Sequence, residues 1–462
     1  VESIKLILNK SLPADYLDLL IAPVTDAEIV ASLKSINPNK SPGPDGYTSH
    51  FYCATWDIVG RDILRAVHSF FNNSTLLKEA NATYIALVPT ISNPTTVKDF
   101  RPISCCNTVY KCISKLIANR LKVCLPHIIS SNQSAFVPGR LLAENVLIAH
   151  DLIKGYSCNK ISPRCALKVD IMKAFDTLSW DFIHNTLAAF GFPQVFIGWI
   201  MTCVTTASFS ISINGCHEGY FKGKSGIRQG DPIFPYLFVI CMEVLTCMLN
   251  NLRHACDFQF HPNCEKTQLN HLCFADDLFI FCKGNLSSIQ HVKNALNQYY
   301  AYSGLDINPN KSQLYCAGLS SNEKMAVLCC LGFQEGRLPV RYLGIPLVAR
   351  KPRRVDCAPL LDAITARIDH WSSRWLSYAG RIVLIKSVLY SLCAFWASII
   401  CLPKGVIQEL ERKFRAFLWR NMGARIAWNS ICFPLNEGGL AIRKIEDLNL
   451  VFNLKHLWRF YC

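Results

Sequence analysis

Two adjacent carboxylates, Asp276 and Asp277, lie in the middle of a run, residues 271–282, that is otherwise almost wholly apolar. The run is too short to cross a membrane but suits two buried strands. Aspartate is depleted in strands, and burying a charge without a partner is costly, so the pair needs a structural reason. The pattern predicts a hairpin whose tip presents both carboxylates to a shared cation. The alternative is an ordinary hairpin turn that contains aspartate.

A third carboxylate follows another predicted strand. Residues 165–171 read as a strand that ends at Asp170, 106 positions before Asp276. Elements this far apart in sequence can be adjacent strands of one antiparallel sheet. Carboxylates at rigid strand ends suit a pair of Mg²⁺ ions about 3.5–4 Å apart, because this hard cation prefers oxygen ligands and leaves sites open for phosphates. The ordered set, rather than any single aspartate, therefore predicts two-metal chemistry.

The remaining segments predict a mixed helical and sheet protein of two or three subdomains. The first 35 residues read as amphipathic helix, with a helix start at Thr25 and Glu28, and Ser179 is expected to cap another helix that ends near Gly191. The other expected elements are helices near 51–72, 110–123 and 286–303, a wholly apolar and therefore buried helix at 235–249, and strands at 84–89 and 340–347.

Charge is unevenly distributed along the chain. Residues 337–462 carry 20 Lys and Arg against 8 Asp and Glu, whereas residues 1–336 carry 28 against 25. A basic C-terminal quarter favours a polyanion as partner, although solvated helix faces account for part of the excess. Hydrophobic residues make up 51% and charged residues 18%, which excludes a disordered protein.

The 23 cysteines lie mostly among apolar neighbours and form no Cys-x-x-Cys pair. We therefore expect reduced thiols, no structural zinc and an intracellular compartment, nuclear or cytoplasmic. The uncharged stretch 387–403 is short for a membrane span and is predicted to be a buried helix, so no membrane partner is expected. Because Val1 is not an initiator Met, we expect a piece of a longer reading frame.

From about Asn37 onwards, the chain resembles the reverse transcriptases of non-LTR (LINE-type) retrotransposons, especially the plant kind. The matching motifs stand in the family's order. They lie at residues 41–46 (SPGPDG), 100–104 (FRPIS), 167–176 (LKVDIMKAFD), 226–232 (GIRQGDP), 274–277 (FADD), 304–308 (GLDIN) with Lys311-Ser312, 342–347 (YLGIPL) and 437–443 (EGGLAIR).

The resemblance implies an α+β right-hand polymerase with fingers, an antiparallel-sheet palm and a helical thumb. Residues 1–36 would be a helical extension, 37–164 mainly fingers, 165–350 mainly palm, and 351–462 a basic helical thumb and C-terminal region. The implied function is RNA-directed DNA polymerisation of retroelement RNA, with RNA template, DNA primer and dNTPs as partners and two Mg²⁺ ions, which Mn²⁺ can replace. An endonuclease or RNase H domain would lie outside this chain, and the sequence is silent on oligomeric state.

The resemblance also assigns roles to individual residues. Asp170, Asp276 and Asp277 would ligate the metals, helped by the backbone carbonyl of Ile171. The nucleotide would be held by Arg101 on its triphosphate, by Phe175 as an aromatic wall under the sugar, and by Gln229 with Gly230 beside the template. Lys311 would protonate the leaving pyrophosphate. For Phe175 the alternative is simple core packing, and for Lys311 a solvated turn.

Three positions depart from the family pattern. Thr90 and Ser225 stand where a basic residue is usual, and Phe234 replaces a small serine. A missing phosphate contact at Thr90 costs about 1.5–3 kcal/mol if a charge-assisted hydrogen bond is lost. These departures support an alternative hypothesis, a decayed copy that binds nucleic acid without polymerising. An RNA-synthesising enzyme is disfavoured by Phe175, because an aromatic wall crowds a 2′-hydroxyl.

Overall fold

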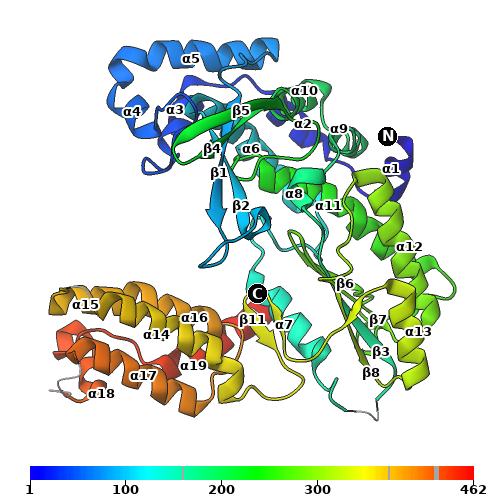
Figure 1. Cartoon of the computed structure of the whole chain (residues 1–462), viewed down its shortest axis with the longest axis vertical. Helices are drawn as coiled ribbons and strands as arrows, with labels where there is room; N and C mark the ends of the chain where they lie inside the picture. The colour runs from blue at the N-terminus through cyan, green and yellow to red at the C-terminus, as the bar shows by residue number, and fades with distance from the viewer. Residues whose placement is uncertain (159–160, 373–374, 421–425, 462) are drawn as a thin grey trace. The chain divides into compact units, whose positions relative to one another are not determined.

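The structure is a computed structural model that describes residues 1–158, 161–372, 375–420 and 426–461 (Figure 1). Two compact units can be distinguished. Unit 1 comprises Val1–Arg140 and Pro163–Glu335, and unit 2 comprises Leu141–Ser162 and Gly336–Cys462. The boundaries of fingers, palm and thumb given above stay a prediction.

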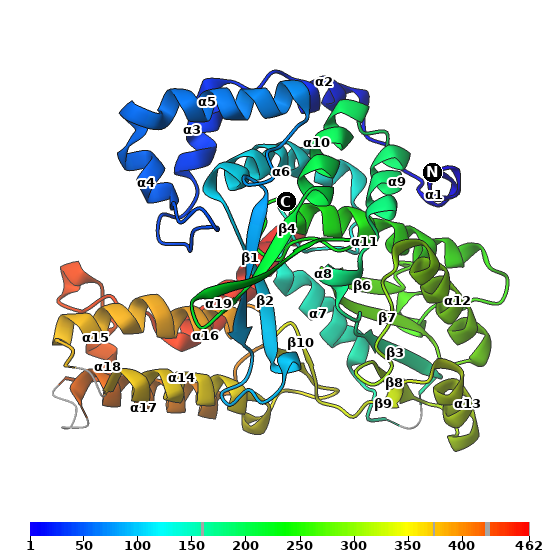
Figure 2. The same ribbon diagram turned by 45° about the horizontal axis from the view of Figure 1, so that its top comes forward.

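The central sheet of unit 1 has the strand order β6-β7-β3-β8-β9. Its strands are β3 (Arg164–Val169), β6 (His271–Phe274), β7 (Asp277–Lys283), β8 (Gln313–Ala317) and β9 (Gln334–Glu335). Strand β3 pairs antiparallel with β7 and β8, and β6 pairs antiparallel with β7. Figure 2 shows these strands side by side, with α12 and α13 beside them. The predicted hairpin and the predicted pairing of distant strands are both confirmed.

A second sheet in unit 1 has the order β2-β1-β4-β5. Its strands are β1 (Ala82–Pro89), β2 (Phe100–Cys106), β4 (Ser208–Ile213) and β5 (Cys216–Lys222). β1 and β2 form an antiparallel pair in which Val88 lies opposite Arg101, and β4 adds to β1 in parallel. Every residue of the edge strand β5 is exposed.

The helical core of unit 1 is built around one apolar helix, α11 (Phe234–Asn251), which packs against α6, α9 and α12. This confirms the buried helix predicted from its all-round apolar sequence. The helices of this unit are α1 (Glu2–Ile7), α2 (Leu17–Ile21), α3 (Asp26–Lys34), α4 (Ser49–Ala54), α5 (Trp56–Asn73), α6 (Thr108–Ile128), α8 (Ala174–Thr177), α9 (Trp180–Phe190), α10 (Gln194–Thr205), α11, α12 (Leu286–Ser303) and α13 (Ser321–Leu331).

Local sequence signals were right at helix ends and wrong about helix continuity. Thr25 and Glu28 form the predicted capping box, and the hydroxyl of Ser179 accepts the Phe182 amide at 3.3 Å. The first 35 residues are helical in part, as expected, but before the start at Thr25 the helix is broken into α1, a 3-10 helix at Ala14–Tyr16, and α2. Prolines 13 and 23 interrupt the hydrogen-bond ladder between them. The segment 51–72 likewise divides into α4 and α5.

Unit 2 contains a hairpin of β10 (Val340–Tyr342) and β11 (Ile345–Leu347), so the segment predicted to be extended divides into two short paired strands. Its helices are α7 (Leu142–Ile153), α14 (Ala358–Ser372), α15 (Tyr378–Leu384), α16 (Tyr390–Ala397), α17 (Lys404–Trp419), α18 (Trp428–Ile431) and α19 (Ile445–Tyr461). A five-residue π-helix, Ile385–Leu389, joins α15 to α16. The helix expected at 387–403 begins earlier and ends at Ala397, and the prediction that it is buried is wrong for much of its length, since only 28% of the apolar window in Tyr378–Ala397 is buried.

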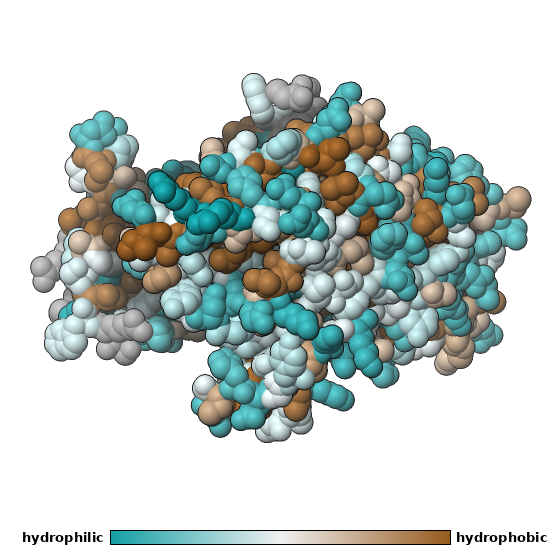
Figure 3. Space-filling model, turned by 90° about the horizontal axis from the view of Figure 1, so that it is seen from above, coloured by the Kyte–Doolittle hydropathy of each residue, from teal (hydrophilic) through white to brown (hydrophobic). Residues whose placement is uncertain are grey.

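Two of the described helical stretches are long and apolar enough to cross a membrane by length and composition alone. In Phe234–His254, 72% of the apolar window is buried inside the protein, and in Tyr378–Ala397 28% is buried. Core helices of soluble proteins also satisfy this criterion. On the face drawn in Figure 3, apolar side chains form small groups among polar ones, which is ordinary for a folded protein.

Candidate active site

The carboxylate pair lies at the tip of the β6–β7 hairpin. Phe274 pairs with Asp277 across the hairpin, so Ala275 and Asp276 alone make the turn. Ala275 has a φ of 56°, a left-handed conformation that is costly for a residue with a Cβ atom. The strands on either side are buried, and a two-residue turn between them leaves the Asp276 carboxylate little freedom.

Asp170 lies directly after β3, beside the start of β7. The last pair of that ladder joins Val169 to Leu278, so the next position on each strand carries an aspartate, Asp170 and Asp277. The Asp170 amide donates to the Ser312 hydroxyl at 3.0 Å, and its carbonyl accepts from the Asn308 amide at 2.8 Å. The backbone of Asp170 is thus fixed on both sides.

The charges of the three aspartates act on one another. Burial raises the pKa of the Asp276 carboxyl, the charge of Asp170 raises it further, and Arg101 lowers it. Burial also raises the pKa of Asp277, as do the charges of Asp276 and Asp170, while Lys168 lowers it. Each raised pKa means that the ionised form is disfavoured until a cation neutralises it. A bound cation would therefore relieve the repulsion among these carboxylates.

The donor set fits a hard divalent cation. All three side chains offer carboxylate oxygens from one end of one sheet. Within the described residues, however, no three His, Cys, Asp or Glu side chains converge into a ready-made cage. Mg²⁺ is commonly bound by one or two carboxylates, with waters and substrate phosphates completing its shell. An incomplete protein shell is what such a site requires.

Phe175 projects from α8, five positions after Asp170, against the first turns of α11. Its ring meets the edges of Phe234 and Phe238, with centroids 4.6 and 5.3 Å apart. The Phe175 carbonyl accepts the Ile227 amide at 2.7 Å, which ties α8 to the loop at residues 226–232. The ring is half-buried, so one part packs on the core while another part stays open.

The loop that carries Gln229 and Gly230 is held by a buried ionic network. Arg228 donates to the Asn81 and Thr83 side chains at 2.8 and 3.0 Å and pairs with Asp231 at 3.3 Å. Its guanidinium also stacks 4.0 Å from the Tyr110 ring centroid. Asp231 in turn accepts the hydroxyls of Tyr110, at 2.5 Å, and Ser114.

This network sets the loop against strand β2. The Gln229 carbonyl accepts the Ser104 amide at 2.9 Å. A Cβ atom on Gly230, whose φ is 117°, would stand only 2.9 Å from the Ser104 carbonyl oxygen. Glycine is therefore required here by both conformation and space.

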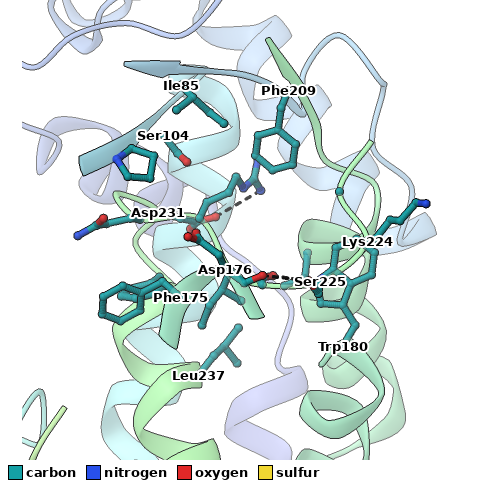
Figure 4. Close-up of a pocket in the computed structure, with 18 of the residues that line it drawn as sticks. Ile85, Ser104, Phe175, Asp176, Trp180, Phe209, Lys224, Ser225, Asp231 and Leu237 are labelled. Atoms are coloured by element: carbon teal, nitrogen blue, oxygen red, sulfur yellow. Dashed lines mark hydrogen bonds and ion pairs between the residues drawn. The ribbon is translucent and has the colours of Figure 1, made fainter. Parts of the chain in front are cut away.

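A cavity of about 320 Å³ is lined by Phe175, by the loop at residues 226–232 and by strands of the second sheet. Figure 4 shows Phe175, Trp180, Phe209 and Ser104 around it. Gln229 also lines this cavity, so two of the residues predicted to contact the nucleotide, Phe175 and Gln229, border the same cavity. The structure brings these residues together although the sequence separates them by 54 positions.

Arg101 and Lys311 are both exposed. Arg101 lies on β2, and its charge acts on Asp276, which places it near the carboxylates. Lys311 follows a turn in which its amide donates to the Asn308 carbonyl at 3.2 Å. It immediately precedes Ser312, the residue that holds Asp170. The proposed role of Lys311 as a proton donor stays a prediction, as do the roles of the other site residues.

The three departures have structural consequences of different kinds. The hydroxyl of Thr90 donates to the Asp99 carbonyl at 2.7 Å, and that of Ser225 donates to the Asp176 carbonyl at 2.9 Å. The Thr90 bond closes the connection between β1 and β2, whereas the Ser225 bond ties its loop to α8, and neither side chain presents a cation. Phe234 supports the ring of Phe175, so this change enlarges the aromatic wall.

The family model for reverse transcriptase (RNA-dependent DNA polymerase) matches residues 91–347, more than half of the chain. The chain belongs to the reverse transcriptase family. The prediction of an α+β right-hand polymerase fold is thereby confirmed, and with it the assignment to a family that depends on divalent metal.

This reverse transcriptase is similar to proteins of mobile elements. It is 27% identical over 451 residues to an uncharacterized 149 kDa protein of transposon TX1 from Xenopus laevis, covering 96% of this chain and 33% of that protein. It is 24% identical to the Pol polyprotein of the type-2 retrotransposable element R2DM from Drosophila melanogaster, covering 96% and 41%. The chain thus spans about a third to two fifths of these relatives.

Among solved structures, the chain is similar to apo telomerase from Candida tropicalis truncated from its C-terminal domain. The TM-score is 0.40 at 12% sequence identity, with 67% of this chain and 62% of that chain covered.

Proposed function

We propose that this chain extends a DNA primer on the RNA of a retroelement, as an RNA-directed DNA polymerase. The observation that carries the proposal is that Asp170 and Asp277 occupy facing positions just beyond the last pair of the β3–β7 ladder, with Asp276 in the adjoining turn. Arg101 supplies positive charge beside them. Membership of the reverse transcriptase family and similarity to proteins of mobile elements support the same reading.

Each of the site residues would have a distinct chemical role. Asp170, Asp276 and Asp277, with the carbonyl of Ile171, would hold two divalent ions, which activate a primer hydroxyl and neutralise charge on the leaving group when bound. Arg101 would bind the triphosphate as a fixed cation. Gln229 and Gly230 would present backbone and amide groups to the nascent base pair. Lys311 would supply a proton to pyrophosphate.

The finer assignments are also part of the proposal. We place the chain with the plant LINE-type elements because of its motifs, including residues 437–443. The basic C-terminal quarter would contact the nucleic acid backbone, and neither apolar helix would enter a membrane. A reducing compartment, nuclear or cytoplasmic, is supported by the 22 cysteines of the described residues, all of which are free thiols.

The decisive test is primer extension on an RNA template with dNTPs and Mg²⁺, comparing the chain with Asp276→Asn. The substitution removes one ligand charge without changing volume, so extension should be abolished while primer–template binding persists. The matched control is Asp57→Asn, which removes an exposed carboxylate of α5 and should extend at the unmodified rate. An unchanged extension rate in Asp276→Asn would show that this carboxylate takes no part in the reaction and would refute the proposal.

A second candidate, binding without synthesis, is favoured by one observation. The hydroxyls of Thr90 and Ser225 are bonded to the backbone carbonyls of Asp99 and Asp176, so two positions where the family usually has a cation offer none to the nucleotide. Salt-sensitive RNA binding with no incorporation in either Mg²⁺ or Mn²⁺ would establish this alternative. Incorporation restored by Thr90→Lys would show that the missing cation is the cause.

A further inference from the structure

A loop outside the recognised motifs covers the free edge of β6. Strand β6 is the outermost strand of its sheet, and residues 132–134 run along its open side. The Cys273 amide donates to the Asn132 carbonyl at 2.9 Å, and the Ser134 amide donates to the Cys273 carbonyl at 3.1 Å. The loop thus acts as a short extra strand beside the carboxylate hairpin.

One side chain of this loop reaches the turn itself. The Oε1 atom of Gln133 accepts the amide of Ala275 at 3.0 Å and that of Ala135 at 2.9 Å. Its Nε2 atom donates to the Cys273 sulfur at 3.2 Å. Gln133 is only 1% exposed, so water cannot readily replace its side chain. Both polar atoms of the side chain are therefore bonded to the hairpin, and Oε1 also accepts from its own loop.

The bonded amide belongs to a residue in an unfavourable backbone conformation. Ala275 is buried and has a φ of 56°, so the turn does not hold this shape by residue preference. An external acceptor that meets its N–H offsets that cost, and a buried N–H without an acceptor would add to it. The next residue is Asp276, so the orientation of the Ala275 peptide determines where the carboxylate points.

The loop itself is anchored. The Arg140 guanidinium donates to the carbonyls of Gln133 and Ser130, each at 2.5 Å, and to that of Ile129 at 2.7 Å. Three carbonyls from residues 129–133, between the end of α6 and the loop, thus converge on one rigid fork. Gln133 is consequently a fixed support and not a side chain that adapts to the hairpin.

We propose that Gln133 is a positioning residue that sets the Asp276 carboxylate for divalent-cation binding through the Ala275 amide. The inference rests on the proposed function only in assigning the cation to the aspartates. It predicts that losing the Gln133 acceptor weakens cation binding, a result that loss of stability alone would not produce.

The experiment compares Gln133→Met with Asn132→Leu. Both substitutions keep the side-chain volume and delete a buried amide of the same loop. The Asn132 amide group donates to the His271 carbonyl at 2.9 Å, on β6 but away from the turn. Both variants should therefore have a lower melting temperature than the unmodified chain. Only Gln133→Met should weaken Mn²⁺ binding, measured by water-proton relaxation, by about tenfold, equivalent to 1.4 kcal/mol.

A double-variant cycle makes the test specific. If Gln133 acts through Asp276, Gln133→Met should weaken Mn²⁺ binding no further in a chain that already carries Asp276→Asn. Additive losses, or equal losses in Gln133→Met and Asn132→Leu, would overturn the proposal. Gln133→Glu retains an oxygen acceptor for both amides, so its Mn²⁺ binding should be no weaker than that of the unmodified chain.

Hydrogen exchange of the unmodified chain covers the case in which Gln133→Met does not fold. The Ala275 amide should exchange as slowly as the Cys273 amide, and exchange at the rate of an open turn would overturn the inference. The two proposals also fail differently. Mn²⁺ binding that depends on Gln133 without primer extension would refute only the polymerase activity, whereas no Mn²⁺ binding at all would refute both.

Discussion

Arg228→Met should be among the most destabilising single changes in unit 1. Arg228 is 6% exposed, and its guanidinium lies among the Asn81 and Thr83 side chains, the Cys203 carbonyl and Asp231. Methionine is similar in length and apolar, so the change removes the charge and the donors while leaving most of the volume. Asp231 would then remain as a buried carboxylate without its cationic partner.

The size of the loss follows from these contacts. Removing one partner of a buried ion pair costs about 3–5 kcal/mol, because the other charge stays buried. The Tyr110 and Ser114 hydroxyls still donate to Asp231, so we expect the lower part of that range. Against a typical free energy of unfolding of about 5–15 kcal/mol, this is a large fraction.

Urea denaturation of Arg228→Met measures the loss as a lower midpoint at unchanged slope. The control is Arg65→Met, which removes an exposed arginine paired with Asp62 at 2.6 Å and should cost less than about 0.5 kcal/mol. Where the variant is still folded, the KM for dNTP should rise, because the network holds the loop of Gln229. A loss within about 1 kcal/mol of the control would refute this account of the loop.

Two further substitutions test the walls of the cavity. Phe175→Val should raise the rNTP/dNTP ratio of kcat/KM by roughly ten- to a hundredfold, since overpacking a rigid site costs about 1–3 kcal/mol and each 1.36 kcal/mol is tenfold. An unchanged ratio with a lower melting temperature would mean that Phe175 only packs on Phe234 and Phe238. Gly226→Ala should lower the melting temperature, because its φ is 79° and a Cβ atom would stand 2.6 Å from the Asp176 carbonyl oxygen. Gly405→Ala, at an open helical position, is its control and should keep the melting temperature or raise it.

The parts of the fold that the sequence predicted are those governed by local patterns. The Asp276-Asp277 hairpin, the apolar helix α11 and the caps at Thr25 and Ser179 all follow from residue type and short-range spacing. Helix continuity near the N-terminus failed because the apolar periodicity continues across prolines 13 and 23, which remove backbone donors.

The support of the site could not be predicted, because it depends on contacts between distant segments. Gln133 lies more than 130 positions before Ala275, and a glutamine in a polar loop has no feature that indicates an inward-facing role. The same holds for Asn81, which meets Arg228 across 147 positions. Motif residues identify the chemistry, whereas the residues that orient them become apparent only in three dimensions.

The raised pKa values of Asp276 and Asp277 imply that ionising these carboxyls lowers the stability of the metal-free chain but favours metal binding, and both effects can be measured. For a carboxyl whose pKa in the folded state lies above its unfolded value of about 3.9, the contribution to stability is full below that value. This contribution is lost as pH rises through the folded-state pKa. Without metal, the folded chain should thus become less stable relative to the unfolded chain as these groups ionise.

A divalent cation binds the ionised form, so the stabilisation that it provides should grow over the same pH range. We expect Mg²⁺ to raise the melting temperature more at about pH 8 than at about pH 5. Asp276→Asn should melt higher than the unmodified chain in EDTA at about pH 8, because it removes a buried charge, and should lose most of the Mg²⁺ effect. Asp57→Asn should change neither value. An Mg²⁺ shift independent of pH, or an Asp276→Asn variant that melts lower in EDTA, would mean that the aspartates are accommodated without a cation.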